Sequence, residues 1–100
     1  MKIYYPYKSD KKDKKYYIVT FTGNKRIYFG AAGMNDFTIY SKTLSSEEAN
    51  KKKEAYIRRH QNNEDWSKSG IDTAVFWSRW YLWNLPTAKA SYADIKKRFL

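Results

Sequence analysis

The sequence predicts an α+β fold, in which a small antiparallel sheet of two or three N-terminal strands packs against two or three C-terminal helices. Strand-forming and turn-forming residues alternate up to about residue 40, whereas helix-start patterns occur from residue 45 onward. Aromatic residues make up 19% of the 100 residues, and aliphatic residues are scarce. Because each aromatic ring buries a large area, a few of them can form the core of a short chain. We therefore expect residues 1–100 to form a single domain.

Two strands and an edge segment are predicted at the N-terminus. The stretch KIYYPYK has β-favouring residues around Pro6, which confines it to an edge strand or an extended arm. The stretches YYIVTF (16–21) and RIYFG (26–30) are predicted strands, and TGNK between them suits a hairpin turn. Within the N-terminal segment 1–15, the charged stretch SDKKDKK (9–15) is expected to be a charged turn or a mobile lysine-rich loop. FTIY (37–40) is expected to be a further short extended segment.

The strongest helix signal is SSEEANKKKEAYIRRHQNN, residues 45–63. Ser45 followed by Glu48 fits a capping box, and the acidic residues of the first turn suit the positive end of the helix dipole. The apolar stripe is thin and consists mainly of Ala49 and Tyr56. This pattern predicts a helix that packs along one edge and exposes the rest of its circumference.

Two further helices are predicted in the C-terminal part. One is expected to run from Thr73 to about residue 83 and to end before Pro86, which cannot continue a helix. The last is SYADIKKRF (91–99), with Ser91 as the N-cap and Asp94 as its reciprocal partner.

The stretch TAVFWSRWYLWNLPT contains three of the four tryptophans, Trp77, Trp80 and Trp83. They can form the core, a platform that stacks bases, a membrane-surface helix or a docking site for a partner. We expect the core, because aliphatic residues are few elsewhere in the chain. Base-stacking platforms usually lie on sheet faces or in grooves. A membrane-surface helix would carry several cations on its polar face, whereas this one offers only Arg79.

The chain carries a net charge of +10, which favours association with polyanions. Lysines and arginines gather in the loop, at the hairpin and on the first predicted helix. From this pattern we predict contacts with the phosphate backbone of nucleic acid, with weak sequence specificity and DNA favoured over RNA. A structural or protein-interaction module with an acidic partner is the alternative, a solvated face that serves solubility stays possible, and the oligomeric state is open. The predicted phosphate-binding residues are Lys11, Lys12, Lys14, Lys15, Lys25, Arg26, Lys51, Lys52, Arg58 and Arg59.

Signals for catalysis are weak, so we expect a non-enzymatic protein without a metal or cofactor. The chain has no cysteine, which excludes disulfides and thiolate metal ligands. The stretch FGAAGMND lacks the pattern of a phosphate-binding loop, and its glycines are expected to serve the backbone. His60 is the only histidine; we expect it to satisfy terminal carbonyls of its helix. A metal-dependent nuclease, in which His60 pairs with Glu64 or Asp65, is the third hypothesis.

The sequence also bears on location. No run of about 18 apolar residues occurs, so no membrane span is predicted. The first fifteen residues, MKIYYPYKSDKKDKK, lack the apolar middle of a signal peptide. We expect a chain that is neither exported nor bound to a membrane.

Three stretches taken together resemble a family of small basic proteins of unknown function encoded by large DNA viruses of eukaryotes. They are RIYFGAAGMNDFTIY, EAYIRRHQNNEDWSKSGIDTAVFWSRWYLWNLPT and SYADIKKRF, which cover nearly the whole chain after its start. Val75, where the family typically has glycine, and the longer YSKTLSSEEANKKK link depart from the family pattern. The resemblance implies a viral origin and a setting in the host cytoplasm or nucleus, or in the virion, and it transfers no catalytic residue. The matching residues are Phe29, Gly30, Gly33, Phe37, Thr38, Tyr56 to His60, Asn63, Glu64, Trp66, Ser69, Gly70, Thr73, Ala74, Phe76, Trp77, Ser78, Trp80, Leu82, Trp83, Asn84, Pro86 and Thr87.

Overall fold

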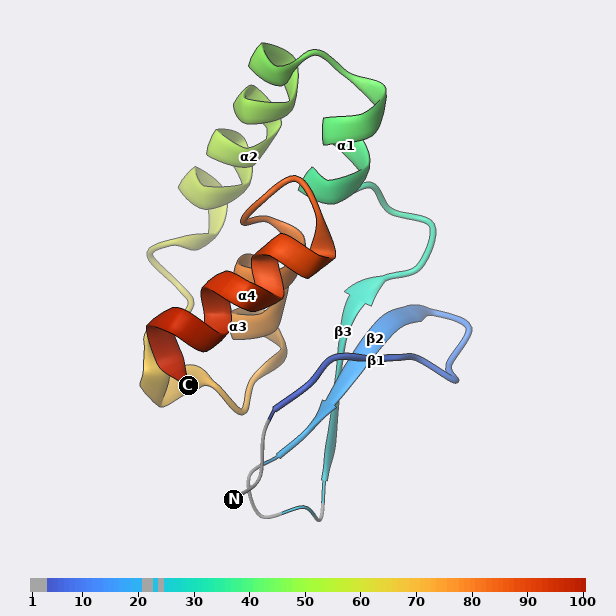
Figure 1. The fold of residues 1–100 in the computed structure, drawn as a ribbon, viewed down its shortest axis with the longest axis vertical. Coiled ribbons are helices and arrows are strands. Elements are labelled where there is room, and N and C mark those ends of the chain that lie inside the picture. The colour runs from blue at the N-terminus through green and yellow to red at the C-terminus, as the bar shows by residue number, and fades with distance from the viewer. Residues whose placement is uncertain (1–3, 21–22, 24) are drawn as a thin grey trace.

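The α+β class is confirmed by a computed structural model that describes residues 4–20, 23 and 25–100. Over these residues the chain forms a three-stranded antiparallel sheet of order β1-β2-β3, followed by helices (Figure 1). The strands are β1 (Tyr7–Lys8), β2 (Lys14–Val19) and β3 (Arg26–Ala31). The predicted edge strand is thus confirmed in β1. The expected loop is shorter than predicted, because β2 already begins at Lys14.

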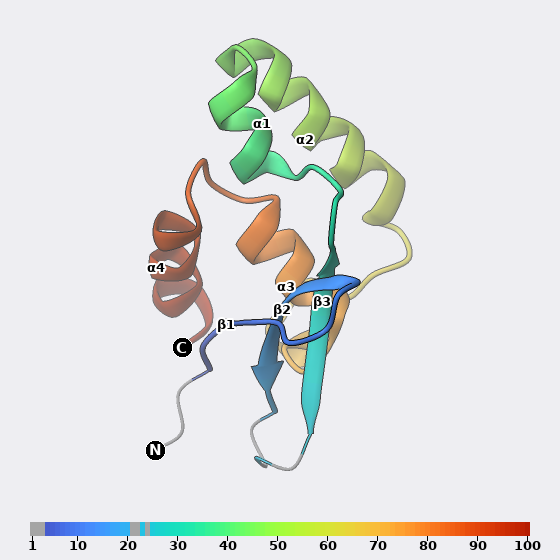
Figure 2. The ribbon, with the colours of Figure 1, turned by 90° about the vertical axis from the view of Figure 1, so that its right-hand side faces the viewer.

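The helical part follows the sheet in one continuous run. Its elements are α1 (Phe37–Thr43), α2 (Ser46–His60), the 3-10 turn η1 (Lys68–Gly70), α3 (Ala74–Trp77), the π-helical turn η2 (Ser78–Leu82) and α4 (Ala88–Phe99). Figure 2 shows the pair α1 and α2 beyond one end of the sheet. Helices α3 and α4 cover one face of the sheet. No described helix covers the opposite face (Figures 1 and 2).

The core forms where the inner face of the sheet meets α3 and α4. Ile18 and Phe29 of the sheet are buried at 0% and 1% exposure, and they lie in one cluster with Trp77 and Ile95. The Trp77 Nε1 atom donates a hydrogen bond of 2.7 Å to the Ile71 carbonyl, so its polar atom is also satisfied. The prediction of a tryptophan-rich core is therefore confirmed for Trp77. Trp80 and Trp83 are only half-buried.

Helix α1 corrects the expectation of an extended segment at FTIY. The carboxylate of Asp36 accepts hydrogen bonds from the backbone N–H groups of Thr38 and Ile39, at 2.9 and 3.3 Å. An N-cap of this kind satisfies two donors of the first helical turn. Asp36 also pairs with Lys15 at 2.7 Å, which ties the start of α1 to β2. These contacts outweigh the β-propensity of the aromatic and branched residues that follow.

The start of α4 differs from the prediction as well. The helix begins at Ala88, and the Thr87 hydroxyl accepts a hydrogen bond from the Ala90 N–H at 3.1 Å. Ser91 is not the N-cap; it is fully buried inside the helix, where its hydroxyl accepts from the Leu85 N–H at 3.0 Å. Asp94 is therefore not a capping partner. The cap lies earlier because Thr87 directly follows Pro86, which ends the preceding segment.

Other predicted features are confirmed. The Ser45 hydroxyl caps α2 by accepting from the Glu48 N–H at 3.2 Å. The helix predicted from Thr73 to about residue 83 is present as α3 followed by the π-helical turn η2. Thr73 is its N-cap, with its hydroxyl accepting from the Phe76 N–H at 3.3 Å. Gly30 has φ +79°, and a Cβ there would lie 2.8 Å from Leu82 Cδ1. Gly30 thus allows a backbone conformation and a close approach that a residue with a side chain would not, as expected.

Candidate nucleic-acid interface

A row of tyrosines crosses the face of the sheet that no described helix covers. Side chains alternate between the two faces of a strand, so Tyr17 points away from the core that Ile18 enters. The strand register places Tyr7 opposite Tyr17, and Tyr17 opposite Tyr28. Ring centroids along this line are 5.5 and 5.4 Å apart. We call Tyr7, Tyr17 and Tyr28 the tyrosine row.

Two cations lie directly on the tyrosine row. The guanidinium carbon of Arg26 is 4.5 Å from the centroid of Tyr17, and the Lys11 Nζ atom is 4.2 Å from that of Tyr28. Both side chains belong to exposed residues, so they remain accessible to a ligand. This combination of rings and cations matches the two groups that a nucleic-acid strand presents, bases and phosphates.

A polar network holds this part of the surface in place. The Tyr28 hydroxyl donates to Asp10 at 2.8 Å, and Arg26 Nη1 donates to the same hydroxyl at 3.3 Å. The hydrogen bond from Tyr28 lowers the pKa of the Asp10 carboxyl. Asp10 and Arg26 form an exposed ion pair at 3.5 Å. Such exposed pairs are weak, so Arg26 can exchange Asp10 for a phosphate at little cost.

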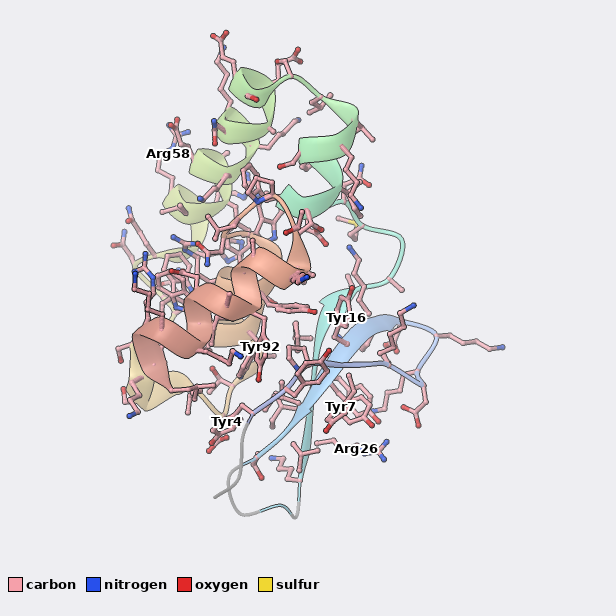
Figure 3. The ribbon with its side chains drawn as sticks, viewed as in Figure 1. Tyr4, Tyr7, Tyr16, Arg26, Arg58 and Tyr92 are labelled. Carbon is pink, nitrogen blue, oxygen red and sulfur yellow. The ribbon has the colours of Figure 1, made fainter. Side chains whose placement is uncertain are left out.

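The aromatic surface extends beyond the row to Tyr5. Tyr5 and Tyr7 are each 48% exposed, although both are large aromatic residues. Their rings meet edge-on at 5.3 Å, and Tyr5 also contacts Tyr92 of α4 at 5.1 Å. Figure 3 shows Tyr7 beside Arg26 on the sheet, with Tyr92 on the side of the helices. The exposed ring surface is thus continuous from β1 to the edge of α4.

The ten basic residues predicted from the sequence fall into two groups. Figure 3 shows Arg26 and Arg58 toward opposite ends of the molecule, whose longest extent is 40 Å. The structure therefore does not bring all ten onto one surface. The group at the sheet comprises Lys11, Lys12, Lys14, Lys15, Lys25 and Arg26, and the group on α2 comprises Lys51, Lys52, Arg58 and Arg59.

Several of these cations already have partners within the chain. The Lys15 Nζ atom donates to Asp36 at 2.7 Å and to the Met34 carbonyl at 2.5 Å, so this lysine links β2 to α1. On α2, Lys51 lies 3.8 Å from Glu47, and Lys52 lies 5.6 Å from the ring of Tyr40. We therefore give more weight to the exposed cations around the tyrosine row than to Lys15.

A cleft of about 450 Å³ lies between β3, the end of α2 and the segment α3–η2. Lys14, Lys15 and Arg59 line it, and they are predicted residues that the structure brings together from the two groups. The Nδ1 atom of His60 is 2.8 Å from a carboxylate oxygen of Glu64. His60 thus pairs with a carboxylate of the following loop, and the expectation that it satisfies a helix carbonyl is wrong. The apolar part of the lining includes Phe29, Tyr56, Val75, Leu82 and Trp83.

No group of three or more metal-binding side chains occurs among the described residues. A hydrolytic metal site normally draws on several histidine or carboxylate ligands. The pair of His60 and Glu64 therefore provides a base and the carboxylate that orients it. Among the described residues it does not extend to the group of metal ligands that the nuclease hypothesis requires.

Sequence reasoning missed the tyrosine row. Its signal was nevertheless present, because Tyr17 and Tyr28 alternate with the core residues Ile18 and Phe29 in their strands. The alternation alone left open which face would be covered, and the pairing of Tyr7 with Tyr17 depends on a turn of unknown register.

Comparison with known proteins finds no matching family model, no matching characterised protein and no matching solved structure. The resemblance to viral proteins, and the host-cell location that it implies, stay predictions. Within the described part of the chain, no helix has the length and apolar character needed to cross a membrane.

Proposed function

We propose that the protein binds single-stranded nucleic acid on the outer face of its sheet. Tyr7 and the adjacent Tyr5 would stack bases on their exposed rings. Tyr17 and Tyr28 would orient the cations beside them, and these cations would contact phosphates. The observation that carries this proposal is the position of Arg26 and Lys11 directly on the rings of the tyrosine row. Protein surfaces that bind single strands combine aromatic rings with positive charge in this way.

A single strand suits this surface better than a duplex. Bases in a duplex are stacked on each other, so their faces cannot reach aromatic side chains. The exposed rings of Tyr5 and Tyr7 would be left without a role on a duplex. Stacking also depends little on base identity, which agrees with the weak sequence specificity that we predict.

Four basic residues near the tyrosine row are the proposed phosphate contacts. Lys11 and Lys12 precede β2, Lys25 directly precedes β3, and Arg26 begins it. All four are exposed. If each neutralises one phosphate, affinity for a single strand should fall about 50-fold between roughly 50 and 200 mM salt.

Fluorescence anisotropy with a labelled strand of about 20 nucleotides tests the proposal. We expect the single strand to bind more tightly than the duplex of the same sequence. The same titration with RNA checks the predicted preference for DNA. Absence of binding at about 50 mM salt, or tighter binding of the duplex, would contradict the proposal.

Charge variants locate the site. We expect Arg26→Gln to weaken binding several-fold and to reduce the salt dependence by about one phosphate contact. Arg58→Gln is the matched control, since Arg58 is an exposed arginine far from the sheet (Figure 3). Equal losses in both variants would indicate a diffuse charge effect rather than a site on the sheet.

A further inference from the structure

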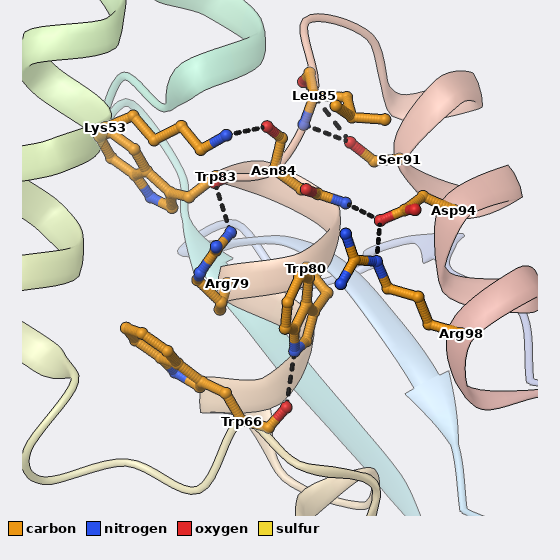
Figure 4. A network of polar contacts seen from close by, with 10 residues as sticks. All are labelled: Lys53, Trp66, Arg79, Trp80, Trp83, Asn84, Leu85, Ser91, Asp94 and Arg98. Atoms are coloured by element: carbon orange, nitrogen blue, oxygen red, sulfur yellow. Dashed lines mark hydrogen bonds and ion pairs between the residues drawn. The ribbon is translucent and has the colours of Figure 1, made fainter.

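Tryptophans and arginines alternate in a stack between α2, η2 and α4 (Figure 4). The guanidinium carbon of Arg79 is 5.4 Å from the ring centroid of Trp66 and 4.4 Å from that of Trp80. On the other side of Trp80, the guanidinium carbon of Arg98 is 5.0 Å from the ring. We call Trp66, Arg79, Trp80 and Arg98 the arginine–tryptophan ladder.

Hydrogen bonds hold the ladder in a fixed position. The Trp80 Nε1 atom donates to the Trp66 carbonyl at 2.8 Å, and Arg79 Nη1 donates to the Trp83 carbonyl at 2.9 Å. Arg98 Nε donates to Asp94 at 2.8 Å. The rings therefore occupy the faces of the two guanidinium groups, and each group keeps further N–H donors along its edge.

Positive charge exceeds negative charge around the ladder. The Lys53 Nζ atom lies nearby and donates to the Asn84 carbonyl at 2.6 Å (Figure 4). Among the described residues, the charged groups that act on Lys53 are Arg79, Arg98 and Asp94. Two carboxylates border these three cations: Asp94, whose Oδ2 atom already accepts from Arg98 and from Asn84, and Glu64, which accepts from the Trp66 Nε1 atom at 2.9 Å.

The excess of positive charge surrounds side chains that are partly buried, Lys53 and Arg79. Burial, reinforced by the neighbouring arginines, lowers the pKa of Lys53. Burial likewise lowers the pKa of Arg79, and its Nε atom is buried without a hydrogen-bond partner among the described residues. A partly buried cation that lacks compensation is costly, and an anion bound beside it would offset that cost.

We propose that the arginine–tryptophan ladder, together with Lys53, binds a phosphate group through the guanidinium edges of Arg79 and Arg98. Arginine is suited to this role because its planar fork of donors matches the oxygens of a phosphate. The stacked rings fix the orientation of both guanidinium groups before the ligand arrives. This site is separate from the tyrosine row and does not depend on it. The phosphate can be a free anion or the terminal phosphate of a nucleic-acid strand.

A titration with inorganic phosphate, followed by NMR of the arginine Nε–H signals, tests the site directly. Sodium chloride at matched ionic strength is the reference. We expect the Arg79 and Arg98 signals to shift in a saturable manner and the Arg58 signal to follow ionic strength alone. Arg79 and Arg98 signals that change no more than in sodium chloride would overturn the proposal.

Two variants add a measurement of affinity. Arg98→Gln should weaken phosphate binding about tenfold, because one charge-assisted contact is lost. Arg98 has a side chain that is 53% exposed, so its replacement should leave the fold intact. Lys42→Gln, which changes an exposed lysine of α1 outside both proposed sites, should bind phosphate like the unmodified protein. Unchanged affinity in Arg98→Gln, with a folded spectrum, would contradict the assignment.

Oligonucleotides distinguish the two sources of phosphate. If a strand with a 5′-phosphate shifts the ladder signals and the same strand with a 5′-hydroxyl does not, the terminal phosphate of a strand is the ligand. If only inorganic phosphate shifts them, the ligand is a free anion. Either result supports the site, and the inorganic phosphate arm remains valid even if the tyrosine row binds no nucleic acid.

Discussion

The tyrosine row and the arginine–tryptophan ladder are both built from aromatic rings and cations, yet they differ in how firmly the rings are held. In the row, Tyr7 is 48% exposed and its neighbours are held mainly by cross-strand packing. In the ladder, each ring or guanidinium is anchored by a hydrogen bond, and Trp80 has a cation on both faces. Alternation of rings and cations therefore does not define one function. The exposed rings of Tyr5 and Tyr7 can stack bases. Rings that carry a cation on a face, such as Tyr17, Tyr28 and Trp80, orient the cations beside them.

The largest expected difference between the two regions is in the free energy of unfolding that is lost when one aromatic ring is removed. We expect Trp80→Ala to lower the free energy of unfolding by about 3 kcal/mol, because a large half-buried ring and its hydrogen bond are lost. Tyr7→Ala should change it by no more than about 0.5 kcal/mol, as is usual at exposed positions. Urea unfolding measures both values. Similar losses in the two variants would show that the row is as much a part of the core as the ladder.

Asp94, the carboxylate bonded to Arg98 of the ladder, provides a second contrast. Asp94→Asn should cost about 2 kcal/mol of stability, because charge-assisted hydrogen bonds to Arg98 and Asn84 are weakened. The same change should tighten phosphate binding several-fold, since it removes the negative charge that competes with the ligand. Calorimetry with inorganic phosphate checks this opposite effect. Weaker phosphate binding in Asp94→Asn would count against the site.

The dependence of stability on pH gives a further test of the role of Asp94. Burial tends to raise the pKa of Asp94, but the hydrogen bonds from Asn84 and Arg98 outweigh it, so the pKa lies below its ordinary 3.8. A lowered pKa in the folded state contributes stability above the unfolded value, and this share is lost as the pH falls through the folded value. Acid unfolding curves should therefore show a smaller loss of stability below about pH 4 in Asp94→Asn than in the unmodified protein. Identical curves would contradict this account.

Local signals accounted for much of the fold. The two long strands, the cap at Ser45 and the burial of Trp77 follow from residue type and spacing. The errors at α1 and α4 have one cause, since a capping side chain decides where a helix begins. Asp36 and Thr87 each follow a non-helical segment, and the side chain of each accepts hydrogen bonding from the backbone of the first helical turn.

The candidate sites were harder to predict because they depend on contacts between distant segments. The ladder joins a loop residue, Trp66, to Arg98 near the end of the chain, and no local pattern connects the two. Even within TAVFWSRWYLWNLPT, the spacing of the tryptophans did not show that Trp77 would be buried while Trp80 would lie between two guanidinium groups. The count of cations predicted a polyanion partner, but only the strand register placed Arg26 on the tyrosines.

The most direct test of the central claim is the affinity of Tyr7→Leu for a single strand. Leucine keeps apolar area at this position but removes the aromatic face. Stacking is worth about 1–3 kcal/mol per base, so binding should weaken by at least about fivefold. Tyr40→Leu, which changes a half-buried tyrosine of α1, is the control and should bind within about twofold of the unmodified protein. Unchanged affinity in Tyr7→Leu, or an equal loss in both variants, would contradict a base-stacking role for the tyrosine row.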